Sequence, residues 1–80
     1  MGVCEAVKNR IIELCNLKRW SFNSLARYSG IPPSTLDNIL NGGSKNPGIV
    51  TIKKICDGLE ISLEEFFSTE EFRSLEQEIE

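Results

Sequence analysis

Residues 21–40, SFNSLARYSGIPPSTLDNIL, carry the pattern that decides the fold of this 80-residue chain. Ser21 has the side-chain hydroxyl of a helix N-cap, and the residues after it predict a short helix. Gly30 suits the left-handed turn that ends a helix, and Pro33 suits the first position of the next one. The stretch therefore predicts two short helices, 22–29 and 33–40.

The spacing within this stretch also predicts how the two helices pack. Helices that cross at about 90–120° approach closely only where the contact residue is small, which Ala26 provides. Leu36 and Ile39 are expected to anchor the second helix, so that its opposite face stays in solvent. Trp20 precedes the N-cap, where a hydrophobic staple would pack, and is expected in the core. With Gly30 at the turn, these positions predict a helix-turn-helix.

Apolar residues repeat at helical spacings on both sides of this pair of helices. Residues 5–17 and 49–59 repeat them every three or four positions, which predicts one helix in each segment. Ser62 is expected to cap a short fifth helix that runs through Phe67. The predicted class is all-α, with a five-helix bundle over residues 1–67 that contains the helix-turn-helix.

Residues 68–80 form an acidic segment with a helical pattern of its own. Ser68 and Glu71 stand in capping-box register and predict an amphipathic tail helix. Such a helix carries apolar side chains at i, i+3 and i+7, and this apolar stripe has to be buried against another surface. Either it packs back on its own domain, or it pairs with a second copy and makes the tail a dimerisation element. The stripe consists of Phe72, Leu75 and Ile79.

Composition argues against several classes of function. The chain has no histidine and no Cys-x-x-Cys pair, so a zinc site and acid–base catalysis near neutral pH lack their commonest side chains. Its three cysteines stand at long, irregular spacings, which argues for reduced thiols and a cytoplasmic location. No apolar run reaches the roughly 18–20 residues that span a bilayer. We therefore expect no enzymatic activity, metal, cofactor, small-molecule substrate or membrane association.

Charges are divided unevenly along the chain, whose formal net charge is −3. Residues 1–59 carry eight cations and four acids, a net charge of +4, whereas residues 60–80 carry eight acids and one cation, a net charge of −7. Most acidic residues are thus separated in sequence from the helix-turn-helix, so the net charge of the whole chain says little about what the helix-turn-helix binds. The cations expected on the exposed side of the first helix and its exit are Lys8, Arg10, Lys18 and Arg19.

Three segments in this order and spacing resemble the Cro and lambda-repressor family, also called the xenobiotic-response-element family. SFNSLARYSGI at 21–31 is similar to the first half of its helix-turn-helix, and PSTLDNILNG at 33–42 resembles its recognition helix and the Asn-Gly stop. PGIVTIKKICDGLEISLEEFF at 47–67 is similar to its fourth and fifth helices. The resemblance covers about residues 5–67 and implies a lambda-repressor-like bundle.

This resemblance implies a sequence-specific transcriptional regulator that binds double-stranded DNA, with a repressor as the leading expectation. The family reads two half-sites as a two-fold dimer, which implies a homodimer. It places the helix over 33–40 in the major groove, where an asparagine amide can pair with adenine. The base-contact candidates carried over are Pro33, Ser34, Thr35 and Asn38. The phosphate-contact candidates are Phe22, Asn23, Arg27, Tyr28, Asn41, Ser44, Lys45 and Asn46.

Several departures from the family pattern favour an alternative function. Phe22 stands where the family often has a polar DNA contact, Asp37 adds a negative charge to the recognition helix, and Gly48 replaces an arginine of some members. Cys15 and Leu40 stand where the family often buries an Arg–Glu pair, as if the pair were replaced together. The alternative is a protein-interaction module of the same fold, antitoxin-like or anti-repressor-like, with weak or no DNA binding.

Overall fold

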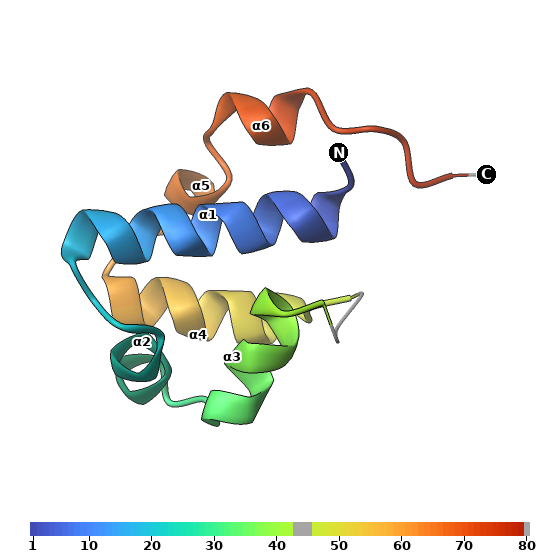
Figure 1. The fold of residues 1–80 in the computed structure, drawn as a ribbon. Helices are drawn as coiled ribbons and strands as arrows, with labels where there is room; N and C mark the ends of the chain where they lie inside the picture. The colour runs from blue at the N-terminus through green and yellow to red at the C-terminus, as the bar shows by residue number, and fades with distance from the viewer. Residues whose placement is uncertain (43–45, 80) are drawn as a thin grey trace.

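The computed structural model describes residues 1–42 and 46–79, and within these ranges it is helical without strands. In Figure 1, α1 and α4 lie across the middle of the molecule, α2 and α3 below them, and α5 and α6 above. The all-α class is therefore confirmed. The helices are α1 (Val3–Lys18), α2 (Phe22–Ser29), α3 (Pro33–Leu40), α4 (Ile49–Leu59), α5 (Leu63–Phe66) and α6 (Glu70–Arg73).

The helix-turn-helix begins and ends at the predicted residues. The Ser21 hydroxyl accepts a hydrogen bond of 3.1 Å from the Ser24 amide, as an N-cap does. Gly30 has a φ of 68°, and the amide after it, that of Ile31, donates to the Ala26 carbonyl at 3.1 Å. This positive φ costs glycine nothing, so α2 stops within one residue and α3 can start close by.

Two other helices end in the same left-handed turn without a glycine. Arg19 has a φ of 57° and Glu60 a φ of 60°. In each case the next amide closes the turn: Trp20 donates to the Cys15 carbonyl and Ile61 to the Cys56 carbonyl, both at 3.0 Å. These bonds satisfy carbonyls that a helix end leaves open and offset the strain of a positive φ.

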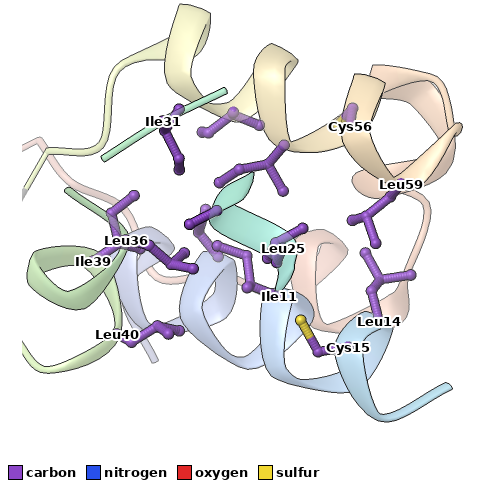
Figure 2. Packing of buried hydrophobic residues seen from close by; sticks show 14 of the residues in the cluster. Ile11, Leu14, Cys15, Leu25, Ile31, Leu36, Ile39, Leu40, Cys56 and Leu59 are labelled. Carbon is purple, nitrogen blue, oxygen red and sulfur yellow. The ribbon is translucent and has the colours of Figure 1, made fainter. Parts of the chain in front are cut away.

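The core lies where α1, α2, α3 and α4 meet, as Figure 2 shows for its labelled side chains. Leu36 and Ile39 point from α3 into this cluster, as predicted, and Ala26 is buried in α2. Cys15 and Leu40 are both buried apolar residues, in keeping with the paired replacement expected from the sequence. Burial raises the pKa of the Cys15 thiol, so it stays protonated and packs as a small apolar group.

Helices α2 and α4 touch at Gly58, a contact that the sequence pattern did not reveal. A Cβ at this position would lie 2.5 Å from the Ser29 Oγ and 3.0 Å from the Ser29 amide nitrogen. Only glycine allows this approach, because the backbone of α2 cannot move aside as a side chain can. Ser29 is itself buried, and its hydroxyl has no hydrogen-bond partner among the described residues.

Arg10 is not on the exposed side of α1, contrary to the expectation. Its side chain is only 11% exposed and forms a 2.6 Å ion pair with Glu13. The guanidinium also donates to two backbone carbonyls at the end of α5, to Phe66 at 2.8 Å and to Glu65 at 3.0 Å. These carbonyls lie at the end of a one-turn helix, where the largely covered guanidinium from α1 is the donor to Phe66 and a second donor, beside Ser68, to Glu65.

The tail helix is much shorter than predicted. Helix α6 is a single turn that starts after Thr69 rather than Ser68, and residues 74–79 are not helical. The Ser68 hydroxyl instead donates to the Glu65 carbonyl at 2.8 Å. Phe72 packs back on the domain, with its ring 4.9 Å from that of Phe67, while Ile79 is 86% exposed. The prediction that Phe72, Leu75 and Ile79 form an apolar stripe on one helix is therefore wrong.

Contacts with the start of α1 hold the tail in its irregular path. The Met1 ammonium lies 3.3 Å from a carboxylate oxygen of Glu76, whose amide donates to the Met1 carbonyl at 3.4 Å. The Glu78 carboxylate accepts a hydrogen bond of 3.5 Å from the Val3 amide. The N-cap of α1, Gly2, has no side chain that could accept a bond from an amide of the first turn. Carboxylates at the positive end of a helix are stabilised, which explains why the segment bends towards α1.

Candidate nucleic-acid interface

Helix α3 presents one face to solvent and buries the other. Leu36, Ile39 and Leu40 are buried in the core and fix the orientation of the helix (Figure 2). Pro33 starts the helix, so a ring without an amide hydrogen occupies a position that would lack a bonding partner. Three base-contact candidates are fully exposed, Pro33, Ser34 and Asn38, and Thr35 is half-buried.

The start of α2 offers backbone amides beside this face. The Ser21 hydroxyl takes the amide of Ser24, whereas the amides of Phe22 and Asn23 precede the first intrahelical bonds. Both residues are exposed, and they sit at the positive end of the α2 dipole. Amides arranged in this way suit an anion such as a phosphate.

A cleft of about 310 Å³ lies between the start of α2 and the exposed side of α3. It lies between the α2 amides and α3, and two of the departures from the family pattern line it. The Phe22 ring, 43% exposed, lines this cleft together with the negatively charged Asp37. Its lining residues are Ser21, Phe22, Asn23, Pro33, Leu36, Asp37, Leu40 and Asn41.

A second cleft, of about 180 Å³, lies on the other side of α3 next to the start of α4. It brings Thr35 and Asn38 of α3 together with Asn46, a phosphate-contact candidate more distant in sequence. Gly48, the N-cap of α4, also lines it and has no side chain to extend from the edge. Two base-contact candidates and one phosphate-contact candidate thus line the same cleft.

Asp37 and Asn41 interact with each other one turn apart on α3. The Asn41 side-chain amide donates to the Asp37 carboxylate, and no described cation pairs with Asp37. The carboxylate therefore keeps its negative charge on the exposed face. The Asn41 amide has a second N–H, which can contact a phosphate while this bond is kept.

Arg27 and Tyr28 are exposed on α2 and belong to a ladder of aromatic rings and cations that the sequence did not predict. The Tyr28 ring stacks on Trp20 with centroids 4.7 Å apart and planes inclined by 25°. The Arg27 guanidinium lies 5.4 Å from the Tyr28 centroid, and the Lys18 ammonium 5.1 Å from that of Trp20. Trp20 is half-buried at the core's edge rather than enclosed.

Part of the predicted site lies outside the described residues. The phosphate-contact candidates Ser44 and Lys45 belong to residues 43–45, as does Gly43 of the predicted helix stop. Gly42, just before them, has a φ of 82° and agrees with a left-handed stop after α3.

Two further searches concern the described ranges 1–42 and 46–79. They contain no cluster of three His, Cys, Asp or Glu side chains that could hold a metal ion. None of the helices in these ranges has both the length and the apolar character of a membrane span. What the described surface offers is hydroxyls, amides and unpaired cations around α2 and α3.

This arrangement defines a helix-turn-helix domain, and comparisons with known proteins identify its family. The Cro/C1-type HTH DNA-binding domain matches residues 10–71, and the chain belongs to this family. The HTH-type transcriptional regulator SlrR of Bacillus subtilis (strain 168) is 39% identical over 62 residues, which cover 76% of this chain. The match spans only 41% of SlrR, less than half of that protein. No solved structure matches the chain.

Proposed function

We propose that this chain is a sequence-specific DNA-binding transcriptional regulator that inserts α3 into the major groove. The observation that carries the proposal is the exposure of Ser34 and Asn38 on a helix whose opposite face is buried. Such a helix can enter a groove without any rearrangement of the core. Membership of a family of DNA-binding domains supports the same reading.

Asn38 is the residue proposed to contribute most to the choice of sequence. Its side-chain amide can donate to and accept from the edge of an adenine, and a bidentate pair of this kind discriminates by about 1–3 kcal/mol. The hydroxyls of Ser34 and Thr35 can donate or accept and discriminate less. Pro33 offers only an apolar contact, for which a thymine methyl group is the natural partner.

Phosphate contacts are proposed on both sides of the groove. The α2 amides at Phe22 and Asn23 would bind one phosphate. Asn46 and Asn41 stand on the two clefts that flank α3 and would contact the backbone beside them. Ser44 and Lys45 remain candidates from the sequence alone. These contacts set the position of α3 but carry no base specificity.

The proposed mode of action is repression by a homodimer. Two copies of α3 would occupy half-sites about 34–36 Å apart, which requires an inverted repeat. A bound dimer prevents other proteins from using the same DNA. The Phe72 ring packs against its own domain, so the tail offers less apolar surface for the dimer than the sequence suggested.

Selection of random duplexes by the purified chain tests this proposal. We expect enrichment of an inverted repeat, with affinity that falls by about 0.9 log unit per log unit of salt for each phosphate neutralised. Asn38→Ala should relax the choice of base at one position in each half-site. Gln77→Ala, which removes an exposed amide from the tail, is the matched control and should leave the selected sequence unchanged. If no sequence is enriched, the proposal fails.

A second candidate is the protein-interaction module, favoured by the exposed Phe22 ring beside Asp37 in the 310 Å³ cleft. Phe22→Ala distinguishes the two functions, because it removes the ring but keeps the backbone amide at the start of α2. A DNA-binding regulator should retain its selected sequence after this change. A module that docks a protein in the cleft should lose its partner.

A further inference from the structure

Several cations at the helix-turn-helix form no ion pair with a described residue. Elsewhere in the described chain, Arg10, Lys53 and Arg73 each pair with a nearby carboxylate. Five cations form no ion pair with any described residue, and three of them gather where α1 ends and on α2. These three are Lys18, Arg19 and Arg27.

We propose that Trp20 is a positioning residue for a phosphate contact made by Arg27, through the stacked ring of Tyr28. The ladder Lys18–Trp20–Tyr28–Arg27 then forms a clamp, called here the aromatic clamp, that extends the DNA contact along the backbone beyond α3. The inference rests on the proposed function and adds residues of α1 and its connector to the DNA-binding surface.

The position of this ladder in the fold indicates that its ligand is a phosphate. Trp20 immediately precedes the N-cap Ser21, so the aromatic clamp adjoins the α2 amides that suit a phosphate. In Figure 1 the connector from α1 leads directly into α2, with α3 beside it, whereas α6 and the tail lie at the opposite end. An anion bound at the α2 amides is therefore on the side of the molecule that carries these cations, and α6 with the acidic tail lies on the opposite side (Figure 1).

Stacking explains why Trp20 matters although it carries no charge. A free arginine loses much rotamer freedom when it binds, and an arginine held against a ring has lost part of it already. The planar guanidinium of Arg27 can stay over the Tyr28 ring, 5.4 Å from its centroid, and still direct the N–H groups at its edge towards phosphate oxygens. Tyr28 is 58% exposed, and its ring is held by Trp20, which stacks on it and packs against the core.

The first test removes the charge at the end of the ladder. On the duplex enriched by the wild-type chain, Arg27→Ala should lower the affinity and reduce the salt slope by about 0.9 log unit per log unit. Arg73→Ala is the matched control, since it removes one positive charge from α6 at the other end of the molecule (Figure 1). It should leave the salt slope as it is.

The second test asks whether Trp20 acts through Arg27. Trp20→Leu should weaken duplex binding by about two- to five-fold, the range typical of an exposed cation–ring contact. Trp20→Phe should restore most of the loss, because a ring can still stack on Tyr28. In an Arg27→Ala background, Trp20→Leu should have no further effect on affinity. Thermal unfolding of each variant establishes that the folded domain is being compared.

The outcomes separate this inference from the proposed function. If the wild-type chain enriches no duplex, both fail. If it binds its duplex and Arg27→Ala leaves affinity and salt slope unchanged, only the aromatic clamp is refuted, and its cations face another ligand. If Trp20→Leu weakens binding equally with and without Arg27, Trp20 has a purely structural role and its positioning role is refuted.

Discussion

On the helix-turn-helix side, formed by α2, α3 and the connector from α1, the cations lie against aromatic rings or in solvent. On the tail side, formed by the start of α1 with α5, α6 and residues 74–79, several charged groups bond to one another or to backbone. Arg10 holds the end of α5, and the Met1 ammonium and the Val3 amide hold tail carboxylates. Both sides pack apolar side chains, since Phe66 is fully buried against Phe67 and Phe72, and the tail side adds these polar contacts.

This difference shows why the net charge of −3 says little about a nucleic-acid partner. A carboxylate that accepts a helix amide or pairs with an ammonium contributes less to the field around the protein than a free one. The cations near α2 keep their full attraction for an anion. The same difference predicts which substitutions affect stability and which affect binding.

The largest effect on stability is expected at Arg10, on the tail side. Arg10→Met keeps the apolar stem but removes the donor to the Phe66 carbonyl and one of the donors to the Glu65 carbonyl, which should lower the free energy of unfolding by about 1–3 kcal/mol. Urea denaturation measures this loss. Arg73→Met, in an exposed pair with Glu70, should change it by less than about 0.5 kcal/mol. Equal losses in Arg10→Met and Arg73→Met would contradict the view that Arg10 contributes more to stability than an exposed ion pair does.

A smaller loss is expected at Gly58, where packing holds the helix-turn-helix side. Gly58→Ala gains helix propensity of roughly 1 kcal/mol, but its Cβ would crowd the backbone of Ser29, and overpacking costs about 1–3 kcal/mol. We expect a net destabilisation of about 1 kcal/mol, measured as a lower Tm. Gly48→Ala, whose Cβ would meet no atom within 4 Å, is the control without a clash and should cost only the few tenths of a kcal/mol lost by alanine at an N-cap. A Tm that rises in Gly58→Ala would show that α2 and α4 can separate at little cost.

The sequence predicts structure well where the deciding contacts join residues close in sequence, and poorly where they join residues far apart in sequence. The bounds of α2, α3 and α4 were predicted correctly, because Ser21, Gly30 and Pro33 act on their immediate neighbours. The path of the tail was not, because it depends on Glu76 and Glu78 meeting the first residues of the chain. No helical periodicity contains that information.

The candidate site shows the same limit. The exposed face of α3 followed from the apolar positions that bury its other face, and its predicted residues are indeed exposed or half-buried. The stack of Trp20 on Tyr28 was missed, because it requires the left-handed turn at Arg19 that brings the connector back to α2. A positive φ at an arginine has no clear signature in the sequence.

The smallest effect on stability is expected from the tail carboxylates. Changing Glu76→Gln and Glu78→Gln together should lower the free energy of unfolding by less than about 1 kcal/mol, since both groups are exposed. The difference from the wild type should disappear in about 1 M salt, where the screening length is about 3 Å. Thermal unfolding at low and high salt measures both. A loss that persists in high salt would mean that hydrogen bonding rather than charge holds the tail.

The most direct test of the contrast between the two sides is a map of backbone amide chemical shifts as the enriched duplex is added. We predict large changes at residues 21–23, 27–28 and 34–38, and unchanged signals at residues 70–79. Changes centred on the tail, with residues 34–38 unaffected, would contradict this assignment.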